Sequence, residues 1–448
     1  MPGRTGRMAQ VCEALRDDGA GAVKGIWARS QGGRVRCRLI GQWLTGHAGW
    51  CLAASVAVHV VAVVTHPTHP LDLRVYREAA PHVLSGGLYD YALLTTPPIP
   101  RLPFTYPPFA ALVFLPLSRL PWAVLVALWQ TLSVAALVVV AVCAVRLLGP
   151  RPGVRGRRQA LLWAAAGLWL EPVRHTLDQG QVNLLLGAVV LWGLAVPRAA
   201  PGRGAGVGLA AAVKLTPAVG GLYLLATRQW RAAAWAVATA ALATALAWGI
   251  APRESARYWS TLVTDTGRVG PVWSVRNQSL RGAVARLLGQ DATATMVLWA
   301  VLALVTVALV GALRAGLRRH DLLGVLVAVE LYGLLVSPVS WSHHWIWCLP
   351  AMIWLAHGPL RGRPLSRVTL GLWAVVTVAR VVPALIGAED HEVHPGAYPA
   401  LLAWPGCVYA GCAVLTLAAV ARGAGEHDRP VLAAGGARER DRSEVAGG

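Results

Sequence analysis

The chain is poor in charged side chains: they make up 14% of its 448 residues, whereas a soluble domain carries about a quarter. Acidic residues are scarcest, with 21 against 41 Lys and Arg, and 56% of all residues are hydrophobic. This composition excludes a conventional soluble enzyme, a disordered protein and a coiled coil. The seven cysteines form no C-x-x-C pair and lie mostly in apolar runs, so they indicate neither a disulfide framework nor a zinc site.

The sequence instead contains apolar runs separated by short arginine clusters. This pattern is typical of a multispanning membrane protein, and it accounts for the net charge of +20 without nucleic acid. Candidate helices lie near 48–65, 121–148, 160–173, 182–197, 205–227, 232–250, 293–313, 322–338, 345–357, 368–387 and 399–421. Several are shorter than the roughly 20 residues that a crossing needs, which predicts broken helices lining a cavity. We expect an all-α polytopic protein with an even number of crossings, about ten to twelve.

Charge predicts the orientation of the chain. The basic segment 1–47 has no signal-peptide core and is expected to be a disordered cytoplasmic arm, and 422–448 a disordered cytoplasmic tail. Between them, 48–421 forms one transmembrane domain. With the arginine clusters inside, the external segments are 66–106, 174–181, 251–292, 340–344 and 389–398. For every arginine cluster to remain inside, segments 107–118 and 205–227 must each be re-entrant or a pair of half-helices.

Asp72 follows the first apolar run closely and precedes Tyr76 by one helical turn. A carboxylate at the membrane surface is partly desolvated, which raises its pKa and suits a general base acting on a sugar hydroxyl. A helix cap with a solvated face is the alternative. His66 and His69 complete an H-x-x-H-x-x-D spacing, but two prolines interrupt it. It therefore cannot lie on one helical face, and we expect no metal.

Two further polar groups interrupt apolar runs. Gln179, Gln181 and Asn183 offer paired donors and acceptors that could bind sugar hydroxyls, or they form a polar turn that caps the next helix. Lys214 lies within an apolar run, where an ionisable group normally faces a cavity or a partner. The alternatives for Lys214 are a structural ion pair with Glu330 or a side chain that reaches the interface.

The last candidates lie near the predicted outer surface. Arg276 could hold a lipid phosphate, with Asn277 beside it, or belong to a solvated interfacial segment. His343 and His344 could orient a phosphate, a sugar or a proton, although the tryptophans around them are also expected in an interfacial belt.

Taken in order, these segments resemble one family between residues 48 and 420. The segments are Asp72 with Tyr76, Gly86-Gly-Leu-Tyr89, Phe104-Thr-Tyr-Pro-Pro108, Gln179-Gly-Gln-Val-Asn183, Lys214-Leu-Thr-Pro217, Asn277-Gln-Ser-Leu280 and Ser337-Pro-Val-Ser-Trp-Ser-His-His344. They are similar to the actinobacterial polyprenyl-phosphate-mannose-dependent alpha-(1→2)-mannosyltransferases, glycosyltransferase family 87, which have a GT-C fold. The resemblance implies an inverting transfer at the outer face of the plasma membrane. It also implies Asp72 as base and His344 or His343 at the donor.

The residues agree with that chemistry. A glycosidase needs two carboxyl groups flanking the bond, whereas transfer from a lipid-linked phosphosugar needs one, because the phosphate leaves unprotonated. Arg276, His343, His344 and Lys214 would offset the phosphate charge. Tyr76, Tyr106, Gln179, Gln181, Asn183 and Asn277 would bind sugar or acceptor.

We therefore expect a polyprenyl-phosphate sugar donor, a glycolipid or glycan acceptor, and no cofactor. The rival hypotheses are a transporter or lipid flippase, and a GT-C transferase that uses another lipid-linked sugar. The identity of the acceptor does not follow from the sequence.

Overall fold

Five helical stretches are long and apolar enough to cross a bilayer. The computed structural model describes residues 43, 45–66, 69–95, 101–149, 153–200, 202–392 and 399–422, so the predicted arm and tail fall almost wholly outside it. The five stretches are α2 (Ala48–Thr65), α6 (Trp122–Leu147), α12 (Trp230–Ile250), α15 (Ala292–Arg318) and the stretch Leu401–Ala421. A sixth crossing results if α18 and α19, bent by 49°, count as one span. Large apolar side chains such as Leu242 and Leu304 are exposed on α12 and α15, as lipid contact requires.

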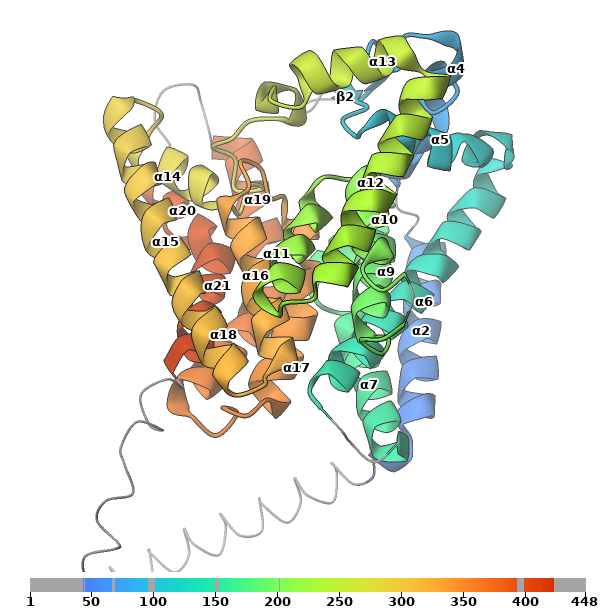
Figure 1. Ribbon diagram of the computed structural model, residues 1–448. Coiled ribbons are helices and arrows are strands. Elements are labelled where there is room, and N and C mark those ends of the chain that lie inside the picture. The colour runs from blue at the N-terminus through green and yellow to red at the C-terminus, as the bar shows by residue number, and fades with distance from the viewer. Residues whose placement is uncertain are drawn as a thin grey trace, which may run out of the picture.

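The helices divide into two groups that lie side by side in Figure 1. The first group contains α2, α6 and α12 together with α7 (Gly153–Gly167), α8 (Glu171–Gln179), α9 (Asn183–Ala195), α10 (Ala205–Val213), η2 (Thr216–Val219) and α11 (Gly220–Ala226). The second contains α15 with α16 (Leu322–Val336), η5 (Ser342–Trp347), α17 (Cys348–His357), α18 (Pro364–Val378), α19 (Val381–Glu392), α20 (Ala400–Ala403), η6 (Pro405–Cys407) and α21 (Val408–Ala421).

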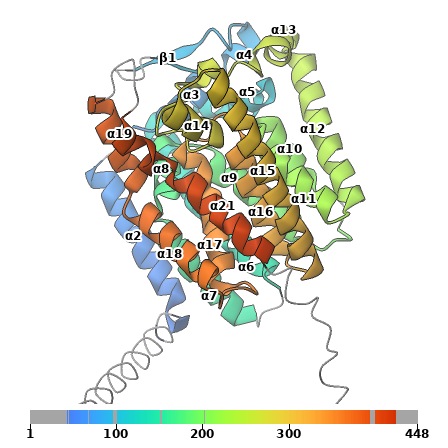
Figure 2. The same cartoon turned by 90° about the vertical axis from the view of Figure 1, so that its left-hand side faces the viewer.

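Short elements from the two predicted external loops 66–106 and 251–292, together with α5 and η1 from segment 107–118, gather at one end of the bundle (Figures 1 and 2). They are α3 (Leu71–Ala79), α4 (His82–Ser85), β1 (Ala92–Leu94), β2 (Arg101–Pro103), α5 (Pro108–Phe114), η1 (Leu115–Arg119), α13 (Pro252–Arg257), the π-turn η3 (Tyr258–Leu262), η4 (Thr266–Val269) and α14 (Leu280–Leu288). β1 and β2 pair antiparallel, with Leu93 opposite Leu102. The start of α7 and the α17–α18 connection lie at the opposite end (Figures 1 and 2).

Local signals set the helix starts. Pro121 precedes α6, and acidic caps open α15 and α16. The Asp291 carboxylate accepts from the Ala294 amide at 2.7 Å, and Asp321 accepts from the Gly324 amide at 2.9 Å. Each cap satisfies one backbone donor that the first helical turn leaves without a partner. These apolar runs therefore become helices with defined first residues.

Segment 205–227 is a pair of short helices, one of the two forms predicted for it. The first, α10, ends at Val213, and Lys214 has an extended backbone, with φ of −148°. Glycines fix the position of α10: a Cβ at Gly208 would lie 2.0 Å from the Ala236 carbonyl oxygen, and one at Gly206 would lie 2.5 Å from that of Val189. Because only hydrogen fits there, α10 packs backbone to backbone against α12 and α9. This packing holds Lys214 beside α9.

One sequence expectation is wrong in detail. Segment 160–173 was expected to be one helix and 174–181 a polar turn, but the chain breaks after Gly167 and forms α8 over Glu171–Gln179. Pro172 occupies the first turn of α8, where its missing N–H costs nothing. Gly180 ends α8 in the left-handed conformation, with φ of 66°. The polar residues thus lie on a short helix.

Candidate active site

Asp72 lies in the first turn of α3, which follows Pro70. Its neighbour in space is the end of α8: a Cβ at Gly180 would lie 2.6 Å from the Cβ of Leu73 and 2.9 Å from that of Pro70. Only glycine allows this approach, and it brings the next residue, Gln181, to Asp72. The Gln181 amide donates to the Asp72 carboxylate. The left-handed turn after α8 therefore connects the predicted base to the second polar segment.

Two buried tyrosines orient Gln181. The hydroxyls of Tyr76 and Tyr106 lie 2.8 Å apart, and they donate to Oε1 of Gln181 at 3.0 and 3.1 Å. Tyr76 is completely buried and stacks on Phe114, with ring centroids 4.4 Å apart. Because Oε1 accepts both hydroxyls, the amide nitrogen of Gln181 is the group left to face Asp72.

Lys214 extends this network into the bundle. Its Nζ donates to Oδ1 of Asn183 at 2.8 Å and lies 3.2 Å from Nε2 of His344 and 3.5 Å from the Tyr106 hydroxyl. Lys214 is buried, with 9% of the residue exposed, so its side chain does not reach out to the interface. An ion pair with Glu330 is also absent among the described contacts, and Oε1 of Glu330 is buried without a hydrogen-bond partner there. Lys214 thus faces the polar cluster.

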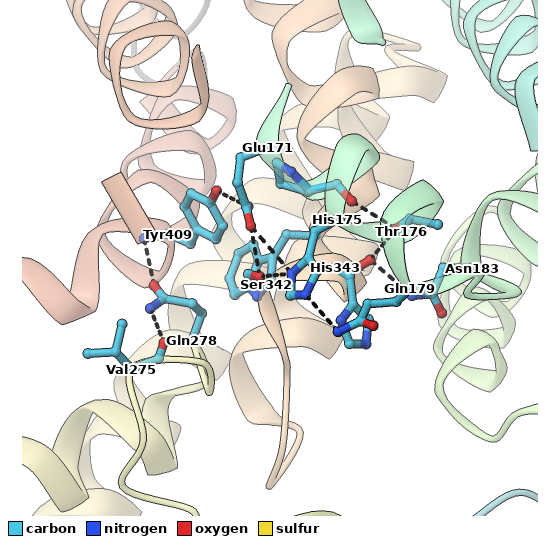
Figure 3. Close-up of polar contacts among 12 residues, drawn as sticks. Glu171, His175, Thr176, Gln179, Asn183, Val275, Gln278, Ser342, His343 and Tyr409 are labelled. Carbon is cyan, nitrogen blue, oxygen red and sulfur yellow. Dashed lines mark hydrogen bonds and ion pairs between the residues drawn. The ribbon is translucent and has the colours of Figure 1, made fainter. Parts of the chain in front are cut away.

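The histidine pair lies on η5, and α8 and α9 hold it from the other half of the molecule. The His343 carbonyl accepts from Thr176 Oγ1 and from Asn183 Nδ2, both at 2.9 Å. The two imidazoles meet edge to face, with centroids 4.7 Å apart. Figure 3 shows Thr176 and Asn183 converging on the carbonyl of His343. Both histidines are therefore held in position beside Lys214.

A cavity of about 290 Å³ opens next to these groups. Asn183, Lys214 and His344 line its polar side. The remainder is mostly apolar, and it is formed by Leu186, Gly187, Val190, Leu215, Pro217, Val219, Gly333, Leu334, Val336, Ile346 and Trp347, with Thr216, Ser337 and Glu330. A cavity with cationic groups on one side and apolar walls on the other suits an amphipathic phosphate.

Burial raises the pKa of the Asp72 carboxyl above its ordinary value of 3.8. The hydrogen bond from Gln181 and the nearby Lys214 and His175 lower that pKa in turn, but burial prevails. The net effect is a more basic carboxylate whose ionised form still has partners. Asp72 is also partly exposed, so a hydroxyl can approach it.

Three candidates lie apart from this cluster or have their side chains engaged elsewhere. Arg276 lies 3.9 Å from Glu389, which also accepts from Ser274 Oγ at 3.0 Å. Asn277 is fully buried, and its amide donates to the carbonyls of Val272 and Pro338, while its Oδ1 accepts from Ser340 N at 2.9 Å. Gln179 lies at the edge of the cluster, with Nε2 3.4 Å from Nε2 of His175.

The proposed site therefore leaves out Arg276 and Asn277, which hold the loop before α14 in place. Of the two histidines before Asp72, His66 bonds Thr65 Oγ1 through Nδ1 at 3.0 Å. The described part of the chain contains no group of three metal-ligating side chains.

Sequence reasoning missed a buried acid, Glu171, at the start of α8. Its Oε1 accepts from Ser342 Oγ at 3.0 Å, and its Oε2 accepts from the Tyr409 hydroxyl. His175 also contacts Ser342, Nδ1 to Oγ, at 2.7 Å. A lone glutamate at the edge of an apolar run is the signal that could have indicated it, because such a charge needs partners.

A family model described as glycosyltransferase family 87 matches residues 104–338, just over half of the chain. Two relatives named polyprenol-phosphate-mannose-dependent alpha-(1-2)-phosphatidylinositol pentamannoside mannosyltransferase extend the comparison. The Mycobacterium tuberculosis protein is 41% identical, with 78% of this chain and 81% of the relative aligned. The Mycolicibacterium smegmatis protein is 40% identical, with 78% and 85% aligned.

The chain belongs to glycosyltransferase family 87. A third relative, a polyprenol-phosphate-mannose-dependent alpha-(1-2)-phosphatidylinositol mannoside mannosyltransferase of M. tuberculosis, is 37% identical over 75% of this chain and 83% of its own. No solved structure is a significant match to the chain. This family 87 enzyme is a glycosyltransferase with several membrane helices, as the sequence predicted. The matched segment includes Tyr106, Gln181, Asn183 and Lys214.

Proposed function

We propose that the enzyme transfers mannose from polyprenyl-phosphate-mannose to a hydroxyl of a phosphatidylinositol mannoside and forms an alpha-1,2 linkage. The names of the relatives, at about 40% identity over most of the chain, supply the substrate class. The observation that carries the mechanism is the connection from Asp72 through Gln181 and Tyr106 to Lys214. It joins one basic carboxylate to one cationic group beside a largely apolar cavity.

The reaction uses Asp72 as the only carboxylate at the reacting bond. Asp72 removes the proton of the acceptor hydroxyl, and the oxygen attacks the anomeric carbon as the bond to the phosphate oxygen breaks. The phosphate keeps the bonding electrons and leaves as a dianion, so no acid needs to protonate it. One displacement turns a beta-linked donor into an alpha-linked product.

Lys214 and His344 act on the donor. Lys214 lies on the polar side of the cavity and brings a positive charge to the position where phosphate charge develops. His344, with His343 behind it, contacts the same phosphate. The apolar wall formed by residues such as Leu186 and Leu334 takes the first part of the polyprenyl chain. Asn183, the third residue of the polar side, holds Lys214 through its Oδ1.

Tyr106 and Gln181 meet the sugar hydroxyls, and Gln179 and Asn183 extend this surface. Tyr76, which was also expected to bind the sugar, is completely buried and instead orients Gln181, which holds the base. Each of these side chains bonds a neighbour and contributes a donor or acceptor to the cluster. Hydroxyl and amide groups are the usual partners of sugar hydroxyls. Specificity for mannose would arise here.

We place the enzyme in the plasma membrane, with an even number of crossings, about ten to twelve, both termini inside and the active site at the outer face. Four shorter apolar helices supplement the long ones, among them Asn183–Ala195 and Leu322–Val336. The elements of segments 66–106 and 251–292 share the end of the bundle that carries Asp72, which supports one external face (Figure 2).

The test is Asp72→Asn in purified enzyme, assayed for transfer of radiolabelled mannose from polyprenyl-phosphate-mannose to phosphatidylinositol mannosides. We expect a loss of about 10² to 10⁴ in kcat, because asparagine keeps the shape but cannot accept the proton. The matched control is Asp291→Asn, an exposed carboxylate at the start of α15 whose capping bond to the Ala294 amide asparagine retains. Unchanged transfer by Asp72→Asn, or transport of lipid without transfer, would favour a transporter.

A further inference from the structure

A second cavity, of about 470 Å³, lies between α6, α9 and the start of α10, and we call it the α9–α10 groove. It shares no lining residue with the cavity beside Lys214. Its walls are mostly apolar and include Val139 of α6 and Val189 of α9. Trp192, which also lines it, is 56% exposed, so the groove opens to the surface of the bundle.

Glycines give the groove its shape. A Cβ at Gly206 would lie 2.5 Å from the Val189 carbonyl oxygen, and one at Gly193 would lie 3.5 Å from Cα of Gly206. Both glycines line the groove, so α9 and α10 meet closely there without side chains that would fill the space beside them. At about 30 Å³ for a group as large as a water molecule or a methylene, the groove holds about 15 carbon atoms, which is one acyl chain of a phospholipid.

Arg203 lines the end of the groove formed by the connection between α9 and α10. It is buried, with 6% of the residue exposed. Its Nε donates to Oε1 of Gln229 at 2.6 Å, and its Nη1 donates to the Val196 carbonyl, so both described partners are neutral. The stretch 179–253, which contains α9 and α10, has no acidic residue. Because a buried charge is costly without a partner of opposite sign, this end of the groove favours an anion.

Three exposed arginines lie near the same end of the groove. Arg198 belongs to the connection between α9 and α10, as Arg203 does. Arg228 and Arg231 flank Gln229 in the sequence, and Gln229 is the residue that accepts from Arg203. None of the ion pairs among the described residues includes any of these arginines. Four positive charges therefore gather there without an acidic partner in the described part of the chain.

The length of α12 places these arginines at a membrane surface. The helix begins at Trp230, beside them, and runs for 21 residues to Ile250, where α13 joins the end of the bundle that carries Asp72 (Figure 1). Such a helix is about 30 Å long, which matches the hydrocarbon thickness of a bilayer. Trp192 and Trp230 are exposed at the arginine end, as interfacial tryptophans are. In the orientation proposed above, this is the cytoplasmic surface, whose leaflet carries anionic lipids.

We propose that the α9–α10 groove binds an anionic phospholipid of the leaflet opposite the proposed active site. One acyl chain occupies the apolar groove, and the phosphate accepts charge-assisted hydrogen bonds from Arg203 and the exposed arginines beside it. The lipid supplies the negative charge that the described residues do not offer to Arg203. Since α10 begins two residues after Arg203 and ends directly before Lys214, the bound lipid stabilises the helix that positions Lys214.

The experiment measures Tm of the purified, delipidated enzyme in detergent with added phosphatidylglycerol or with phosphatidylcholine of the same acyl chains. We expect phosphatidylglycerol to raise Tm by about 2 °C or more, because a ligand that binds only the folded state stabilises it. Phosphatidylcholine should give less than half of that shift. Inorganic phosphate at the same concentration should leave Tm unchanged, because it lacks the chain. Native mass spectrometry of the same samples counts the retained phosphatidylglycerol.

Variants test the two halves of the site separately. Arg203→Gln removes the buried charge but keeps a hydrogen-bonding side chain, and it should lose at least half of the Tm shift. If that variant does not fold, Arg198→Gln combined with Arg231→Gln replaces it, since both positions are exposed. Val139→Trp fills the groove and should also lose the shift, although every arginine remains. The control is Arg318→Gln, an exposed arginine at the end of α15 in the other helix group, which should keep the full shift.

Equal Tm shifts with phosphatidylcholine and phosphatidylglycerol would overturn the proposal, because the site would then recognise no charge. A shift of the same size with inorganic phosphate would reduce the site to an anion site without a chain. Unchanged shifts in the arginine variants or in Val139→Trp would place the lipid elsewhere, and an equal loss in Arg318→Gln would show only a general effect of surface charge. None of these outcomes affects the proposed transfer reaction, which Asp72→Asn tests independently.

Discussion

Nζ of Lys214 lies 3.2 Å from Nε2 of His344, although 130 residues separate them in the chain. The contact joins the break after α10 to the turn before α17, so it bridges the two helix groups of the bundle. Because the ammonium donates, Nε2 of His344 is held as an acceptor. A donor phosphate arriving at the cavity would meet the charge of Lys214 and reorganise this contact.

Replacing Lys214 with methionine should lower kcat by about 10² to 10³, because the positive charge that offsets the leaving phosphate is lost while the length of the side chain is kept. The assay is mannosyl transfer at saturating donor. Lys214→Arg serves as the matched variant and should retain more activity than methionine, since it keeps the charge. Equal activity of Lys214→Met and the parent would remove Lys214 from the phosphate site.

The pH profile should report the raised pKa of Asp72. The base works only when ionised, so activity is full above the pKa of Asp72 and falls as the pH drops through it. Since burial raises that pKa, kcat/KM should decline on the acidic side at a pH higher than an ordinary carboxyl, with its pKa of 3.8, would give.

A second variant tests the direction of the pKa shift. Because Lys214 lowers the pKa of Asp72, Lys214→Met should move the acidic decline of kcat/KM to still higher pH. A shift to lower pH would contradict this electrostatic account.

Much of the cluster could be predicted because polar residues at the ends of apolar runs are conspicuous. Asp72 and Tyr76 share a helical face by their spacing of four, and Lys214 stands out within an apolar run. That these groups meet through Gln181 depends on the close contact at Gly180, which is tertiary. The roles of these residues stay predictions, whereas their proximity is a property of the structure.

Other parts depended on partners that no local pattern reveals. Asn277 looked available for sugar, but its amide is bonded to carbonyls of its own loop and of the turn after α16. Arg276 lies beside Glu389, more than a hundred residues away. The polar stretch 174–181 looked like a turn because its apolar positions are few, yet Pro172 and Gly180 delimit a helix. The number of membrane crossings was equally hard to predict from the sequence, because some of its apolar runs form short helices that pack inside the bundle.

Packing at α10 gives a prediction about stability. Gly208→Ala places a Cβ 2.0 Å from the Ala236 carbonyl oxygen, so α10 must move away from α12. We expect a loss of about 1–3 kcal/mol in the free energy of unfolding, seen as a lower Tm in detergent. The control is Gly221→Ala on α11, where no atom lies within 4 Å of the added Cβ. That variant should keep or slightly raise the Tm, because alanine favours helix.

The orientation of the bundle can be tested with two exposed positions at opposite ends. Ser85 ends α4 on the side of Asp72, and Gly362 lies in the α17–α18 connection, with open space around its Cβ position. In intact cells a membrane-impermeant maleimide should label Ser85→Cys and spare Gly362→Cys, which becomes labelled only after the membrane is opened. The parent has seven cysteines, so labelling is measured above that of the parent.

The reversed pattern would place Asp72 at the cytoplasmic face. The arginines of segment 361–367 would then lie outside, against the usual bias that keeps positive residues in the cytoplasm. It would also require the sugar of the lipid-linked donor to be presented from the cytoplasm. Labelling at Ser85 in intact cells, combined with loss of transfer in Asp72→Asn, would put the base, the donor phosphate and the acceptor on the same outer surface.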